Sequence, residues 1–352
     1  MFEELLTTTD DWFLKPGPAN EVVVSSRVRF ARNLEGRKFP HHASAVEQKV
    51  VVDEVRNALS VLPQAPLLKF IRLNEISSLD RQFLTEHQLI SLEHAASVGE
   101  RAVAFDAQDG LSFLVNEEDH LRLQVFRSGL NLKEGFQYLS QVDQALCGKL
   151  HFAKDHQLGY LTACPTNLGM ALRSSVLLHL PALVYTNRVA QVLQGVTQVG
   201  LTVRGLQGET TQVASAFFQI SNQSSLGKRG SEIVDHVERV AHQLVEVESQ
   251  AQKAVFQQEG VKVQDRICRA LGTLKSAKVM SLQEALDGLS AIRVGLSQKI
   301  LAGIELPLLN QLLILTQPAH LAKIATRELG PEQEAMERAR ILGMTLKKVE
   351  AL

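Results

Sequence analysis

This 352-residue chain has few cysteines, almost no net charge and no long apolar run. Its three cysteines include no C-x-x-C pair, which argues against a disulfide framework or a structural zinc site and is typical of a reducing compartment. No apolar stretch approaches the ~18 residues that span a bilayer, and the first residues lack the basic-then-apolar pattern of a signal peptide. The formal net charge of -1 argues against a general binder of nucleic acids or membrane surfaces. We therefore expect a cytoplasmic protein with neither as a partner.

Common motifs for nucleotide, metal and acyl chemistry are missing as well. The segment 195–200 has the glycine spacing of a phosphate loop, but Leu201 stands where that motif needs lysine. No H-E-x-x-H, G-x-S-x-G or protein-kinase glycine loop occurs. His41 and His42 precede an ordinary helix, and the acidic segment 116–122 lacks the spaced pattern of a calcium loop. We expect no metal site built from protein ligands, and phosphate binding has to use other residues.

The chain has an ordinary globular composition, with 45% hydrophobic and 21% charged residues, and its length allows one large or two smaller domains. Pro16, Gly17 and Pro18 predict an irregular segment over residues 1–20. Residues 44–47 and 281–284 match the capping box that begins many helices. The patterns predict strands at 21–24, 67–73, 101–105, 111–115, 121–126, 158–163, 173–180, 201–203 and 216–220, and helices at 46–59, 131–146, 184–193 and 230–258.

Strand-like segments become rare beyond about residue 255, where helical patterns continue. We therefore predict an α+β fold, with a catalytic domain over residues 21–255 and an all-α C-terminal domain over residues 256–352. The apolar stripe within 306–315 exceeds what a small helical domain can readily bury.

Two polar segments suggest chemistry. Three carboxylates and Arg122 follow the apolar run 111–115, and so much negative charge at a strand end is costly unless a cation is held there. In the segment 204–209, Arg204 and Glu209 again stand beside glycines. Arginines that hold phosphate and glutamates that hold a cation are what phosphoryl transfer onto a guanidinium requires.

Four motifs in order carry a family resemblance over about residues 22–250. They are S-S-R-V-R from Ser25, N-E-E-D-H-L-R from Asn116, C-P-T-N-L-G-M-A-L-R-S-S-V from Cys164 and R-G-L-Q-G-E from Arg204. Each alone is ambiguous, since three arginines are usually a solvated surface, but together they resemble the catalytic domain of the phosphagen (guanidino) kinases. That resemblance implies an antiparallel β-sheet flanked by helices. The short segment before Ser25 and the long helical C-terminal segment resemble a bacterial branch that phosphorylates arginine residues of proteins.

The resemblance implies ATP and Mg²⁺ as cofactors and assigns most of the site to nucleotide binding. It places five arginines on the ATP phosphates: Arg27, Arg29, Arg122, Arg173 and Arg204. It implies further nucleotide contacts from Ser25, Ser26, Val28, Gln88, Ser174, Ser175, Val176, Leu177, Gly205, Leu206, Gln207, Gly208 and Glu209. Gln88 stands where many relatives have a histidine, and Gln207 replaces an aromatic or basic residue.

Three further residues are implied to be catalytic. A protonated guanidinium is not nucleophilic, so it has to be aligned and deprotonated. The resemblance makes Glu118 the base and Glu209 the clamp that positions the acceptor. Cys164 matches the reactive cysteine of the family, and nearby arginines should favour its thiolate. Its own sequence context fits a buried structural thiol equally well.

The implied function is transfer of the ATP γ-phosphate to arginine residues of proteins, marking them for regulated degradation in a stress response. The resemblance implies arginine-containing substrate proteins, a homodimer, an activator protein and Clp-type protease machinery as partners. Glu334 and Ala335 replace the arginine and aspartate of the branch's phosphoarginine pocket, so we expect no response to phosphoarginine. The alternatives are a small-metabolite guanidino kinase and a non-catalytic adaptor. Offering labelled ATP with free arginine or with an arginine-rich protein separates them.

Overall fold

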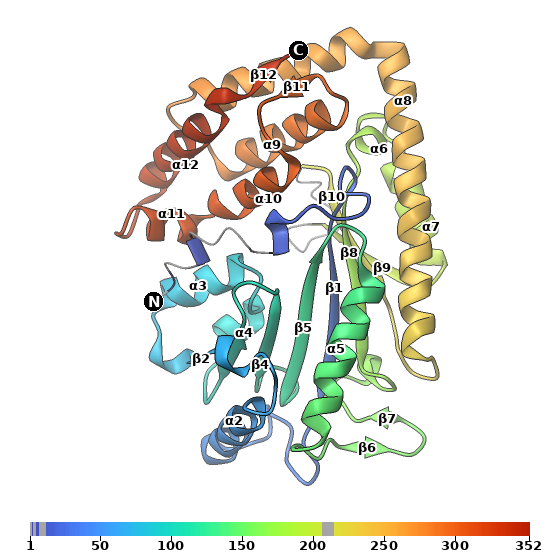
Figure 1. Ribbon diagram of the computed structural model, residues 1–352, viewed down its shortest axis with the longest axis vertical. Coiled ribbons are helices and arrows are strands. Elements are labelled where there is room, and N and C mark those ends of the chain that lie inside the picture. Colours follow the sequence, from blue (N-terminus) through green and yellow to red (C-terminus); the bar gives the residue numbers. More distant parts are fainter. Residues whose placement is uncertain (1, 3–4, 7–11, 206–214) are drawn as a thin grey trace.

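The computed structural model describes residues 2, 5–6, 12–205 and 215–352. In this part of the chain an antiparallel sheet of eight strands has the order β2-β3-β4-β5-β1-β8-β10-β9 (Figure 1), which confirms the predicted α+β class. The strands are β1 Val23–Arg32, β2 Lys69–Arg72, β3 Ala102–Phe105, β4 Leu111–Val115, β5 Leu121–Ser128, β8 Leu172–His179, β9 Leu201–Gly205 and β10 Phe217–Asn222. Two-residue strands add the ribbons β6 Lys154–Asp155 with β7 Gly159–Tyr160, and β11 Leu301–Ala302 with β12 Glu350–Ala351.

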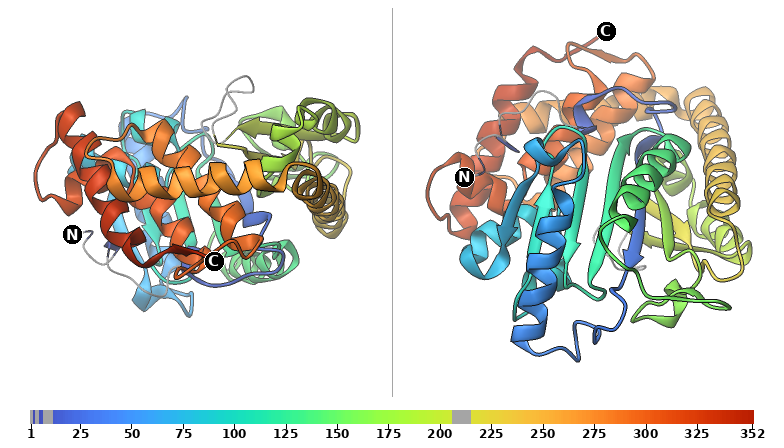
Figure 2. Two further views of the ribbon diagram at one scale, coloured as in Figure 1. Left: turned by 90° about the horizontal axis from the view of Figure 1, so that it is seen from above. Right: turned by 60° about the horizontal axis from the view of Figure 1, so that its bottom comes forward.

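Helices cover both faces of the sheet (Figure 2). On one face α2, α5 and α8 pack against the strands, and α3 and α4 lie on the other. The helices are α2 Ala45–Leu59, α3 Ser78–Glu86, α4 Leu92–Ala96, α5 Leu132–Cys147, α6 Pro181–Tyr185, α7 Val189–Gln198, α8 Gly230–Ser276, α9 Leu282–Ser297, α10 Leu306–Leu315, α11 Pro318–Ile324 and α12 Pro331–Thr345, and the 3-10 turns used below are η1 Trp12–Leu14 and η4 Pro165–Asn167. None of the helices within the described ranges is both long enough and apolar enough to cross a membrane.

Alternation along β1 decides which side chains face which layer. Val28 and Phe30 are buried under α5, whereas Arg27 and Arg29 point to the opposite face, because successive side chains of a strand alternate. The sheet therefore has an apolar face that packs on long helices and a face that carries arginines.

The C-terminal segment stacks at one end of the sheet (Figure 1). Helix α8 packs on one face of the sheet, against β8 and β10. It takes non-helical φ and ψ values at Glu259 and leads into α9–α12. Apart from the ribbon β11–β12 this segment is helical, with its own core around Leu289, Leu312 and Leu342. Both predicted capping boxes are present, on Ser44 and Ser281.

Several predicted elements differ in detail. The strand expected at 21–24 is β1, which continues to Arg32, and the helix expected at 230–258 is α8, which continues to Ser276. The strand expected at 158–163 shrinks to the two residues of β7. Its first residue, Gly159, has φ of 73°, outside the extended range of a regular strand, so the strand does not extend back through it. The helix expected at 184–193 divides into α6 and α7, because Asn187 has φ of 56° and so interrupts the helical backbone.

Candidate active site

Strand register gathers the five arginines in one cleft. Arg29 of β1 lies directly opposite Arg173 of β8, Arg122 of β5 is opposite Ala31, and Arg204 of β9 is opposite Gln219 of β10. Because paired residues of neighbouring strands project to the same face, these side chains share one side of the sheet. With Arg27 they line a cleft of about 830 Å³.

The arginines repel one another across this cleft. Burial, followed by repulsion from Arg122 and Arg173, lowers the pKa of Arg27 to about 9. Burial and repulsion from Arg27 and Arg122 also lower the pKa of Arg29, and burial and Arg204 lower that of Arg173. So much like charge in a partly dehydrated cleft is suited to a polyanion, which would relieve the repulsion and accept several charge-assisted hydrogen bonds.

The acidic segment 116–120 turns from β4 into β5 at one edge of the cleft. Asn116 has φ of 58° and its backbone N–H donates to the carbonyl of His120 at 2.9 Å, which closes the turn. The carboxylate of Glu117 pairs with Arg122 at 2.6 Å, and both Glu117 and Glu118 line the cleft. Loss of hydration and then repulsion from Asp119 raise the pKa of Glu118, in the direction that suits a general base.

Asp119 connects this turn to the loop that carries Cys164. Its buried Oδ1 accepts hydrogen bonds from Asn33 Nδ2 at 2.6 Å and from the Ala163 backbone N–H at 2.7 Å. Cys164 is therefore held beside the acidic turn, and its Sγ lies 3.0 Å from Thr166 Oγ1 within η4. The thiol is partly exposed rather than buried, which argues against the structural alternative.

The other candidate residues fall into three groups. Ser25, Gln88, Ser175 and Leu177 line the cleft. Ser26, Val28, Ser174 and Val176 are buried on the opposite face of the sheet, so only their backbone is near the arginines. Gly205 ends β9, and the remaining candidates, Leu206, Gln207, Gly208 and Glu209, lie outside the described residues.

Arg32, the last arginine of β1, has a structural place. Its side chain is buried and pairs with both carboxylate oxygens of Asp143 of α5, at 2.9 and 2.8 Å. Its even position on β1 directs it to the helix-covered face, away from Arg27 and Arg29. It thus anchors α5 to the sheet.

Sequence reasoning missed several residues that line the cleft. On β5, Gln124 and Phe126 follow Arg122 at alternate positions, and this period of two could have indicated them. On the far side, Phe13 and residues of α9, α10 and the segment after it also line the cleft. No local pattern indicates these, because they come from segments far away in the sequence. The C-terminal residues are Leu286, Asn310, Leu313, Ile314 and Gln317.

No group of three or more His, Cys, Asp or Glu side chains could hold a metal ion within the described ranges.

Comparisons with known proteins define the class first. The family model for the ATP:guanido phosphotransferase C-terminal catalytic domain matches residues 50–251. The crystal structure of lombricine kinase is 25% identical in sequence, with a TM-score of 0.59, and the match covers 69% of this chain and 71% of the lombricine kinase chain. A duplicated taurocyamine kinase from Schistosoma mansoni is 25% identical, with a TM-score of 0.60, and the match covers 70% of this chain and 35% of the taurocyamine kinase chain. The class is a guanidino phosphotransferase that uses ATP, as the sequence predicted.

The particular family follows from nearer relatives. The protein-arginine kinases of Symbiobacterium thermophilum and Moorella thermoacetica are 40% and 41% identical over 345 and 341 residues. These alignments cover 97% and 95% of this chain, and 98% and 96% of the relatives. The family model of the protein-arginine kinase McsB C-terminal domain matches residues 260–352. The chain belongs to the protein-arginine kinases.

Proposed function

We propose that this enzyme transfers the γ-phosphate of ATP to the guanidinium of arginine residues in proteins. The observation that carries the proposal is the cluster of five arginines, with Glu118 at the edge of the same cleft. The names of the relatives support a protein as the acceptor. They favour it over the small-metabolite alternative, and the intact arginine cluster argues against a silent adaptor.

In this mechanism the arginines bind and fix the triphosphate. Arg29, Arg173 and Arg122 place fixed positive charge around the phosphoryl group, where charge develops as the bond to ADP breaks. Glu118 accepts the proton from the guanidinium nitrogen while the new nitrogen–phosphorus bond forms, and its raised pKa supports this role. Cys164 stands beside the acceptor as electrostatic support. Glu209 would align the second guanidinium nitrogen.

Mg²⁺ belongs to the same proposal. It prefers oxygen ligands and is commonly bound through substrate phosphates, and it would neutralise negative charge on the triphosphate. Within the described residues, four carboxylates line this cleft, on Glu86, Glu93, Glu117 and Glu118. Glu117 is already paired with Arg122, and Glu86 with the start of α11. We therefore expect the phosphate oxygens to hold most of its coordination.

The wider role is proposed from the family. We infer a cytoplasmic homodimer that marks proteins for degradation by Clp-type machinery in a stress response, with an activator protein. We place the boundary between a catalytic domain and a helical domain near residue 255, close to the non-helical Glu259 within α8.

Incubation of an arginine-rich protein with Mg-ATP, followed by phosphorus NMR, tests the activity. Acid-labile phosphate on nitrogen in the protein is the expected result. Phosphate on free arginine alone would favour the metabolite kinase, and no transfer to either acceptor would favour the adaptor.

A further inference from the structure

The cleft has two chemically different ends. Arg122 and Glu118 lie at the acidic turn, whereas Phe126 lies four residues further along β5, about 13 Å away. At that end the lining becomes more apolar, with Phe13, Leu313 and Ile314 facing it. The polar side chains nearby are the amides of Gln88, Asn310 and Gln317, the carboxylate of Glu86, and the guanidinium of Arg27, which lies 5.2 Å from the centroid of the Phe126 ring. A flat apolar group with a polar edge fits this end better than a phosphate does.

Helix α10 is anchored at this end by hydrogen bonds and apolar contacts. Arg293 of α9 is buried, and its Nη1 donates to Asn310 Oδ1 at 2.7 Å while its Nη2 donates to the carbonyl of Asn20. Phe13 of η1 packs with Phe126 of β5 and with Ile314 of α10 in one small apolar cluster. These contacts join the C-terminal helices to the sheet across the cleft.

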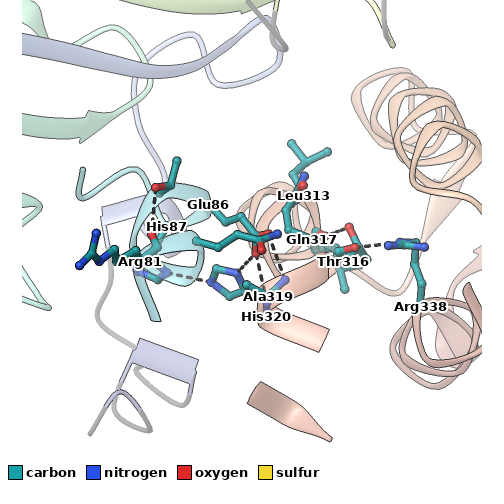
Figure 3. Close-up of polar contacts among 12 residues, drawn as sticks. Arg81, Glu86, His87, Leu313, Thr316, Gln317, Ala319, His320 and Arg338 are labelled. Carbon is teal, nitrogen blue, oxygen red and sulfur yellow. Dashed lines mark hydrogen bonds and ion pairs between the residues drawn. The ribbon is translucent and has the colours of Figure 1, made fainter. Parts of the chain in front are cut away.

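Glu86 supplies a second anchor, at the start of α11. Its carboxylate accepts hydrogen bonds from the backbone N–H groups of Ala319, at 3.0 Å, and His320, at 3.1 Å, and lies 2.9 Å from His320 Nδ1 (Figure 3). Glu86 also lines the cleft. Two residues later Gln88 has φ of 64°, and its carbonyl accepts a hydrogen bond from Gln124 at 3.0 Å.

We propose that η1, α10 and Gln317 form one wall of the pocket for the nucleotide base, so that bound nucleotide bridges the sheet and the C-terminal helices. This inference rests on the proposed function. Leu313 and Ile314 supply an apolar surface for the ring, and the amides of Gln317 and Gln88 supply donors and acceptors for its edge. Binding would then stabilise the docking of the C-terminal helices, since the ligand contacts both parts.

Calorimetric titration of two ligands separates the base from the phosphates. ADP carries a base, whereas inorganic tripolyphosphate presents only the phosphates that the arginines bind. Leu313→Ala and Gln317→Ala should each weaken ADP binding about tenfold and leave tripolyphosphate binding unchanged. Leu315→Ala, on the same helix but outside the cleft lining, is the matched control and should change neither affinity.

The outcomes are distinct. ADP affinity unchanged in both variants would overturn the composite pocket, and so would an equal loss for ADP and tripolyphosphate. Failure of the unmodified enzyme to bind ADP would instead contradict the proposed function. As a second readout, ADP should slow amide hydrogen exchange in α10 and α11, and tripolyphosphate should not. Equal protection by both ligands would also count against the base wall.

Discussion

Arg29 and Arg173 lie directly opposite each other on neighbouring strands, with their side chains on the same face of the sheet. Like charges in this arrangement are destabilising, and burial together with the neighbouring arginines lowers the pKa of both groups. The fold thus maintains an unfavourable contact that a bound polyphosphate would turn into a favourable one. The repulsion should lower the free energy of unfolding of the free protein and increase its affinity for a polyphosphate.

Replacing one member of this pair should therefore stabilise the free protein. Arg29→Met keeps the length of the side chain but removes its charge, and we expect the free energy of unfolding without nucleotide to rise by up to about 1 kcal/mol. ADP binding should weaken at least about tenfold, because a charge-assisted contact is lost. Urea titration and calorimetry measure the two effects. The control is Arg127→Met, which removes an ion pair with Glu134 on the opposite face of the sheet and should leave ADP binding unchanged. A lower free energy of unfolding for Arg29→Met would contradict the claim that repulsion between Arg29 and Arg173 destabilises the free protein.

Glu118→Gln should lower the rate of transfer about 10²–10⁴-fold, because the general base is lost. ADP affinity should stay close to that of the parent, since the nucleotide contacts are made by the arginines. Steady-state kinetics and ADP titration on the same preparation check both halves. A rate within a few-fold of the parent would remove Glu118 from the role of base.

The acid limb of the pH–rate profile should reflect Glu118. A general base has to be deprotonated, so activity falls as pH drops through its pKa, and the raised pKa of Glu118 places that fall above the usual glutamate value of about 4.3. The residual activity of Glu118→Gln should lack this limb. A limb that persists unchanged in the variant would belong to another group.

Cys164 should react with alkylating agents faster than Cys147, although it is the less exposed of the two. Burial and the nearby Asp143 raise the pKa of Cys147 and disfavour its thiolate, whereas the side chain of Cys164 lies close enough to the guanidinium of Arg173 for the two to interact electrostatically. Mass spectrometry after brief alkylation compares the sites, with Cys268 as an exposed reference. Bound ADP and arginine should slow modification at Cys164, and Cys164→Ser should fold normally but lose much of its activity. Equal rates at all three thiols would contradict the prediction.

Added phosphoarginine should not change activity. Arg338 lies four residues after Glu334, in the segment that aligns with the phosphoarginine pocket of the branch, and it is buried. Its Nε donates to the carbonyl of Thr316 at 2.8 Å (Figure 3), and its Nη1 donates to the carbonyl of Met280 at 3.0 Å. It is committed to holding α12 against the neighbouring segments, and Glu334 would repel phosphate. Kinase assays over a range of phosphoarginine concentrations test this. Dose-dependent activation would mean that Arg338 leaves its carbonyl partners to bind the ligand.

Arg338→Ala should in turn destabilise the protein by about 1–3 kcal/mol, since buried carbonyls lose their donor. Urea titration measures the loss. Arg340→Ala, at an exposed position paired with Glu337, is the control and should cost much less stability.

Light scattering on the unmodified protein tests the proposed dimer, and a monomer at assay concentration would refute it.

The sequence by itself supplied the candidate arginines and some local elements. The order of the motifs and their family resemblance assigned Arg27 and Arg29 to the phosphates, whereas their common face follows from the extension of β1 through Arg32. The capping boxes at Ser44 and Ser281 were predicted from local pattern alone, because they depend on residues three apart. Such features need no knowledge of what packs where.

Packing between distant segments decided the rest. The leucines of 306–315 suggested a dimer surface, yet Leu309 and Leu312 are buried in the chain's own core and Leu313 faces the cleft. Whether an apolar side chain meets a partner, a core or a ligand depends on which helix lies across from it. Strand register places Arg29 opposite Arg173, and helix docking brings Glu86 to the start of α11. Both arise only when the whole chain has folded.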